Sequence, residues 1–353
     1  MGDYVKHVRN SNLELYRVIV MLLIVSHHYV VNSGLFQLMD NSTLNFNSSF
    51  LYIFGMWGKT GIDCFVLITG YFMCKSEATV FKFFKLVLEI IFYNIIIYSI
   101  FLILGIVELD LKGIVRAIIP LEHTSDFTTG FILFYPFIPF LNKIIKSSTH
   151  KEHLKLIILS LFIYTFLYMA PGFGVTYNYI TWFIVLYFIS SYIRLYPSPR
   201  YDTNNYLWGG ITILLTTISI ASVFVLRNWN PYWLVSDSNA IFAVAISISS
   251  FMFFKNLKIK HSKIINLMGA STFGVLLIHA NSDAMRQWLW KNTLQNTEFF
   301  TSPYLWIHAI LSVLIIFIIC VIIDQIRIRY IEKPFFNTKL FNNVCNKIES
   351  LLK

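Results

Sequence analysis

The chain has 353 residues, of which 56% are hydrophobic and only 13% are charged. This balance excludes an ordinary soluble globular protein and indicates a polytopic membrane protein. The formal net charge of +10 would suit a nucleic-acid-binding protein, but the lysines and arginines gather in alternate loops, which is a signal of membrane topology. We therefore expect no nucleic-acid partner and a single integral-membrane domain over residues 1–353.

Ten apolar segments are each long enough to cross a bilayer as a helix. We expect spans at about residues 14–33, 50–73, 80–106, 128–145, 154–171, 178–196, 206–227, 238–255, 264–283 and 303–328. The first segment lacks a cleavage site after its apolar run, so it reads as an uncleaved span and not as a signal peptide. The sequence thus predicts an all-α fold with about ten transmembrane helices.

Positive residues mark every second connection between these spans. On one side lie Lys6, Arg9, Lys75, Lys82, Lys143, Lys146, Lys151, Lys155, Arg194, Arg200, Lys255, Lys258, Lys260 and Lys263 and, as the charges of the tail, Arg327, Arg329, Lys333, Lys339, Lys347 and Lys353. The opposite connections, such as NSGLFQLMDNSTLNFNSS, have few or none. The positive-inside rule therefore predicts cytoplasmic N- and C-termini, with the last span ending near residue 328 and a short basic cytoplasmic tail at 329–353.

The longest outward connection, about residues 107–127, contains the stretch LKGIVRAIIPL. Its apolar positions fall at helical spacing beside Lys112 and Arg116. This pattern predicts a short helix at the outer membrane interface.

Three ionisable residues, Arg17, His27 and His28, lie inside the first predicted span, where such side chains are costly. Arg17 and His28 are eleven residues apart, so at about 100° per residue they share one helix face and lie about 16 Å apart along the axis. His27 points about 80° away from Arg17. Alternatively, Arg17 snorkels to the headgroups and pairs with Glu14, while His28 bonds a neighbouring helix.

On the predicted cytoplasmic side, Lys82 and Lys85 open the third span, and Glu89 follows Lys85 by one helical turn. They are either snorkelling lysines with a Lys85–Glu89 ion pair or a phosphate-binding patch near Arg17.

A second polar layer is expected at the outer side of the membrane, at the depth of His28. It comprises Asp63, His279, Asp283, Arg286 and His308. Each residue could separately be a hydrogen-bonding core residue, but their collection at one depth favours a site. The four cysteines show no paired spacing, so neither a disulfide framework nor a metal site is indicated.

Four stretches resemble, in order, motifs of the acyltransferase 3 family of bacterial membrane proteins. Arg17, ten residues and then His28 resemble its R-x10-H motif. The segments GIDCFVLITGYF, STFGVLLIHAN and IRYIEKPF resemble motifs of its second span, of a late span and of its closing E-[KR]-P. The resemblance covers nearly the whole chain. One departure is Gly130-Phe131, where the family commonly has Trp-Phe or Trp-Tyr.

This resemblance implies an enzyme that moves an acyl group, usually acetyl, from cytosolic acyl-CoA to a glycan hydroxyl at the outer face. It implies that Arg17 and His28 are needed for activity. Lys82 and Lys85 stand where many members have R-x-x-R, so they would contact the phosphates of CoA, although lysine lacks the bidentate fork of arginine. The chain ends about 25 residues after the last span, so we expect a member without the extracytoplasmic hydrolase-like domain.

We therefore expect His28 to act as general base on a sugar hydroxyl, with an acyl-histidine intermediate as an alternative. Asp63 would orient His28 or the acceptor, and His279 and His308 are acceptor-side candidates. Acetyl-CoA would be the donor co-substrate, with no bound cofactor or metal. The expected partners are acyl-CoA, a glycan or lipid-linked saccharide and membrane lipids, with homo-oligomerisation open, and the expected location is the bacterial cytoplasmic membrane.

Two other classes of function fit the same charges. A transporter or flippase also uses intramembrane Arg and His residues, and it would move substrate without consuming acyl-CoA. A scaffold subunit of a polysaccharide assembly machine would tolerate substitution of Arg17 and His28. The aligned pair counts against a scaffold, and the lack of internal repeats counts against a transporter.

Overall fold

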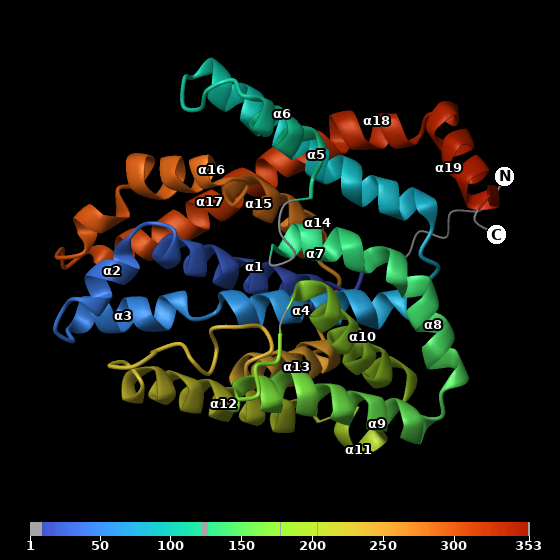
Figure 1. Ribbon diagram of the computed structural model, residues 1–353, viewed down its shortest axis with the longest axis horizontal. Coiled ribbons are helices and arrows are strands. Elements are labelled where there is room, and N and C mark those ends of the chain that lie inside the picture. The colour runs from blue at the N-terminus through green and yellow to red at the C-terminus, as the bar shows by residue number, and fades with distance from the viewer. Residues whose placement is uncertain (1–8, 122–125, 177, 203, 352–353) are drawn as a thin grey trace.

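The structure, a computed structural model, describes residues 9–121, 126–176, 178–202 and 204–351. Within these ranges every regular element is a helix. The long helices run side by side as a bundle, with α1 (Ser11–Val31) in its middle (Figure 1). The prediction of an all-α membrane protein is therefore confirmed. The terminal charges Lys6 and Lys353 lie outside the described residues.

Six helical segments in the described residues are long and apolar enough to cross a membrane. They are Ser11–Val31, Phe46–Met73, Val80–Ile103, Phe127–Ser147, Asn205–Val225 and Leu305–Phe336. They match the first four, the seventh and the tenth predicted spans. The sixth and eighth appear as the shorter apolar helices α10 (Tyr179–Leu195) and α13 (Ile241–Asn256).

Several of these segments are built from more than one helix. The second span joins α3 (Phe46–Gly55) to α4 (Gly58–Met73), and the fourth joins α7 (Phe127–Phe134) to α8 (Ile138–Ser147) through the 3-10 turn Tyr135–Phe137. The remaining long helices are α5 (Val80–Ile103), α12 (Asn205–Val225) and α17 (Leu305–Arg327). The shorter ones are α2 (Leu35–Asp40), α6 (Leu111–Ile118), α11 (Pro199–Asp202), α16 (Asp283–Gln287), α18 (Lys333–Phe336) and α19 (Lys339–Leu351), with π-helical turns at Trp288–Thr293 and Ile328–Glu332 and a 3-10 turn at Asn296–Phe299.

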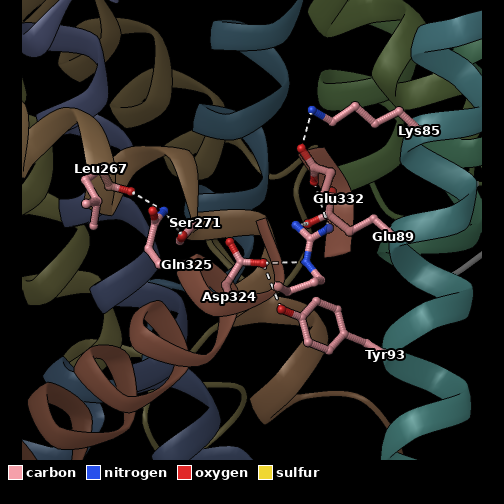
Figure 2. A network of polar contacts seen from close by, with 9 residues as sticks. Lys85, Glu89, Tyr93, Leu267, Ser271, Asp324, Gln325 and Glu332 are labelled. Carbon is pink, nitrogen blue, oxygen red and sulfur yellow. Dashed lines mark hydrogen bonds and ion pairs between the residues drawn. The ribbon is translucent and has the colours of Figure 1, made fainter. Parts of the chain in front are cut away.

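The fifth and ninth predicted spans are not single regular helices. The fifth consists of α9 (His150–Leu161) and the π-helical stretch Phe162–Leu167. The ninth is divided at Ser271 into α14 (Lys263–Ala270) and α15 (Thr272–His279). At this break the Gln325 amide donates to the Leu267 carbonyl and to Ser271 Oγ, which supplies the carbonyl with a donor (Figure 2). The total of ten spans stays a prediction.

The connections fall at two opposite ends of the bundle. The start of α5, the turn between α8 and α9, and α19 lie at the right-hand end in Figure 1, whereas α2 and α16 lie at the left. This alternation is the arrangement expected from the loop charges, and the assignment of the right-hand end to the cytoplasm stays a prediction. The expected helix in the long outward connection is confirmed as α6, whose first turn is capped by Asp110.

Candidate active site

A cavity of about 910 Å³ opens in the half of the bundle that we expect to face outward. Its walls come from the C-terminal half of α1, the start of α4, the outer half of α5, α6, and the α15–α16 region. The α1 residues in the wall are Met21, Ile24, His27, His28 and Val31. Of the predicted outer polar layer, the cavity takes in Asp283 and Arg286 beside His28.

His28 is joined to His279 across the interface between α1 and α15. The His28 Nδ1 and His279 Nε2 atoms are 2.9 Å apart. His279 is completely buried and does not line the cavity, so it stands behind His28 as seen from the open space. His279 Nδ1 in turn lies 2.6 Å from the carbonyl oxygen of Val275, one turn earlier in α15.

This chain of contacts assigns the protons when both rings are neutral. A carbonyl oxygen can only accept, so His279 Nδ1 donates to Val275, and the lone pair of His279 Nε2 accepts from His28 Nδ1–H. His28 Nε2 then carries a lone pair, and no described residue hydrogen-bonds to it. The ring that lines the cavity therefore offers a basic nitrogen, held in one tautomer by a second histidine.

His27 also lines the cavity, although its direction on the helix had favoured only His28. Its Nδ1 lies 2.5 Å from the carbonyl oxygen of Gly55 and donates to it. Its ring packs directly on Gly58, where a Cβ atom would overlap the imidazole. The glycine at the start of α4 is thus needed for this close packing. The two adjacent histidines in the sequence were the available signal that His27 also lies at the cavity.

Asp63, expected to orient His28 or the acceptor, lies elsewhere. It is completely buried in α4, and its Oδ1 accepts a 2.9 Å hydrogen bond from the indole N–H of Trp182. Its Oδ2 has no hydrogen-bond partner among the described residues. The residue that contacts His28 is His279, so Asp63 joins α4 to α10 and is not seen to hold the base.

His308, the other acceptor-side candidate, does not line the cavity. Its Nδ1 lies 2.8 Å from the hydroxyl of Tyr29, and its ring stacks on Phe299 at 3.8 Å between centroids. Asp283 and Arg286, in contrast, do line the cavity, and they form an ion pair of 2.8 Å at its rim. In the part of the chain that is described, no three His, Cys, Asp or Glu side chains are grouped as metal ligands.

Arg17 lies one helical turn below the cavity, counted from Met21, and does not line it. Arg17 forms an ion pair of 3.7 Å with Glu14, which is the pairing that the alternative interpretation of the sequence predicted. Glu14 also pairs with Arg9 at 3.2 Å. The Arg17 side chain keeps 25% of its surface exposed, and its contact with Glu14 is a long one.

The two lysines of the third span have different environments. The Lys82 ammonium is exposed and donates to the carbonyl oxygen of Glu77 at 2.6 Å. Lys85 Nζ lies 2.6 Å from Glu332, in the EKP segment after α17. The alternative of a Lys85–Glu89 ion pair was wrong, because Glu89 pairs with Arg327 instead (Figure 2).

Arg327 is the centre of a buried ionic network that the sequence did not predict, because this residue was counted among the charges of the tail. Its guanidinium contacts three carboxylates, Glu89, Asp324 and Glu332, at 2.8 to 2.9 Å, and Tyr93 donates to Asp324 (Figure 2). The network joins α5 to the end of α17 and fixes the EKP segment. An aspartate near the end of an apolar span was the available signal.

The departure at Gly130 also has a structural counterpart. A Cβ atom at Gly130 would lie 2.6 Å from the Cβ atom of Tyr179, so the glycine allows α7 to approach the start of α10 closely. Tyr179 lines the cavity, and its hydroxyl accepts a 2.8 Å hydrogen bond from Lys59. Lys59 and Tyr179, two cavity residues outside the family motifs, are therefore joined by this hydrogen bond.

Residues 10–324 match the acyltransferase domain that defines the acyltransferase 3 family. No curated protein and no solved structure matches the chain significantly. The matched segment takes in the helices around the cavity together with Arg17, His28 and His279. Because it covers nearly the whole chain, and because the chain is a bundle of apolar helices, the protein belongs to the acyltransferase 3 family and is a multi-pass membrane acyltransferase.

Proposed function

We propose that the protein transfers an acetyl or other short acyl group from cytosolic acyl-CoA to a sugar hydroxyl of a cell-surface or lipid-linked glycan at the outer face of the bacterial cytoplasmic membrane. The observation that carries this proposal is the His28–His279 pair, which leaves an unpartnered imidazole nitrogen at the wall of a cavity. A base in that position suits abstraction of a hydroxyl proton.

The donor enters from the cytoplasmic end of the bundle in this proposal. The Arg17 side chain is partly exposed there, and it lies about 16 Å from His28 along the axis of α1. The pantetheine arm would follow this helix and bring the thioester to the cavity. Lys82 is open to a phosphate, whereas Lys85 would first have to leave Glu332, so we assign the phosphate contacts to Arg17 and Lys82 before Lys85.

The acceptor occupies the outer part of the cavity. Its volume of about 910 Å³ lies within the range of pockets that hold small organic ligands. Aromatic rings and polar side chains line it together, among them Tyr98, Phe127, Tyr179 and Asn281. Such a lining suits a sugar, which presents apolar faces and hydroxyl edges.

The proposed reaction needs no base other than His28. His28 Nε2 takes the proton of the sugar hydroxyl while the hydroxyl oxygen bonds to the acyl carbon. The carbon–sulfur bond breaks as the tetrahedral adduct collapses, and the CoA sulfur receives the proton from the His28 imidazolium. His279 keeps its Nδ1–H on Val275 throughout, so it holds the orientation of His28 and takes no proton.

The test is the O-acetyl content of the host's surface polysaccharide, measured by proton NMR. We would compare cells making the wild-type protein, the His28→Gln variant, the His308→Gln variant at equal membrane abundance, and no protein. Acetyl signals with the wild type and His308→Gln only are the expected result, because His308 does not line the cavity. Acetylation by His28→Gln at the wild-type level would refute the assignment of the base.

The same strains also distinguish acyl transfer from the alternative function of a transporter. If the polysaccharide carries no acetyl group in any strain, we would measure release of CoA from acetyl-CoA by isolated membranes. An absence of wild-type-dependent release would favour glycan movement over acyl transfer, because a transporter does not consume the thioester.

A further inference from the structure

Lys59 is a cavity residue that no motif had singled out. It stands in the first turn of α4 and lines the cavity together with His27 and His28. Its neighbour Gly58 packs on the His27 ring, so the Lys59 backbone lies close to that imidazole. Its segment lies at the end of the bundle where positive residues are rare, so it does not serve as a topology signal.

The contacts of Lys59 leave its charge without a carboxylate partner. Its ammonium donates a 2.8 Å hydrogen bond to the Tyr179 hydroxyl and lies 5.3 Å from the centre of that ring. Among the described residues no carboxylate forms an ion pair with it. Asp63 and Asp237 act on it only from a distance. Their carboxylates accept hydrogen bonds from Trp182 and Tyr168.

The position of Lys59 on its helix also makes its positive charge unfavourable. The N-terminal turn of a helix carries the positive pole of the backbone dipole, and a cation there is placed unfavourably. A half-buried ammonium at that pole, without a carboxylate, is stable only beside negative charge or water. The ammonium, the start of α4 and the polar cavity wall instead form a site that favours an anionic oxygen.

We propose that Lys59 stabilises the negatively charged oxygen that forms on the acyl carbonyl during transfer. This inference rests on the proposed function, because it requires an acyl group beside His28. When the acceptor oxygen bonds to the acyl carbon, the electron pair of the carbonyl moves to its oxygen, and Lys59 donates a hydrogen bond to it. The pair returns when the carbon–sulfur bond breaks, so Lys59 keeps all its protons.

The experiment uses the full-length protein in membranes with radiolabelled acetyl-CoA and the purified surface polysaccharide. Lys59→Met removes the charge, and Lys59→Arg keeps it. Lys291→Met is the matched control, because Lys291 is an exposed lysine of the Trp288–Thr293 turn and does not line this cavity. Gel filtration of the solubilised variants confirms that each one folds.

We expect Lys59→Met to lower kcat by roughly 10²- to 10³-fold, the usual loss when one oxyanion donor is removed, with little change in the KM for acetyl-CoA. Lys59→Arg should recover part of this loss, and Lys291→Met should stay near the wild type. A folded Lys59→Met variant with the kcat of the wild type or of Lys291→Met would overturn the proposal.

The measurement also separates this oxyanion from an acidic group on the acceptor. If Lys59→Met raises the KM for the polysaccharide with kcat unchanged, and a carboxyl-reduced polysaccharide removes the difference, the anion belongs to the acceptor and the oxyanion role is refuted. If the wild type transfers acetyl and Lys59→Met transfers it equally well, only the Lys59 inference fails. If the wild type transfers none, the proposed function fails with it.

Discussion

Replacing His279 tests whether the second histidine only positions the first. His279 is completely buried and gives His28 a hydrogen-bond acceptor at 2.9 Å. His279→Leu removes this acceptor and places an apolar side chain of similar size in the same position. His279→Gln keeps an acceptor oxygen, so it is the conservative variant.

The size of the effect follows from the hydrogen bond. A neutral hydrogen bond contributes about 0.5–1.5 kcal/mol, so its loss should lower the population of the correctly oriented His28 tautomer by roughly 2- to 13-fold. Removing a general base itself costs roughly 10²- to 10⁴-fold. We therefore expect kcat to fall by about tenfold in His279→Leu, much less than in His28→Gln, and to be largely retained in His279→Gln.

The assay is label transfer from radiolabelled acetyl-CoA by membranes that contain equal amounts of each variant, checked by immunoblot. Acetyl-CoA is varied so that kcat and KM are obtained separately. The KM for acetyl-CoA should stay constant, because His279 does not line the cavity. Wild-type kcat in a folded His279→Leu variant would refute the positioning role, and a loss as large as that of His28→Gln would show that His279 itself moves the proton.

Two further predictions follow from buried contacts. Arg327→Met leaves Glu89 and Asp324 without their cation and leaves Glu332 with Lys85 alone, and breaking a buried ion pair costs about 3–5 kcal/mol. The temperature at which half of the solubilised protein loses its gel-filtration peak should therefore fall clearly below that of Arg329→Met, whose side chain is exposed. Equal temperatures would contradict a stabilising network. Gly58→Ala should displace the His27 ring and lower transfer, whereas Gly210→Ala, which meets nothing within 4 Å, should not. Full activity in Gly58→Ala would show that the His27 position is unimportant.

Much of the fold follows from local patterns in the sequence. Apolar run length and the charges of alternate loops predicted the helices that have the length of membrane spans, because both properties act within one segment. The breaks inside spans were missed. Hydropathy averages over the break at Ser271, where the Gln325 amide replaces the missing helical donor.

For the candidate site, too, the sequence predicted some features and the packing of the helices decided the others. The sequence by itself determined that Arg17 and His28 share one face of α1, because helical periodicity fixes directions within a single helix. It could not determine that His28 meets His279, 251 residues away, that Glu89 meets Arg327, or that Lys59 stands free of carboxylates beside the histidines. Those partners depend on the depth and rotation of one helix against another, which the packing of the whole bundle decides.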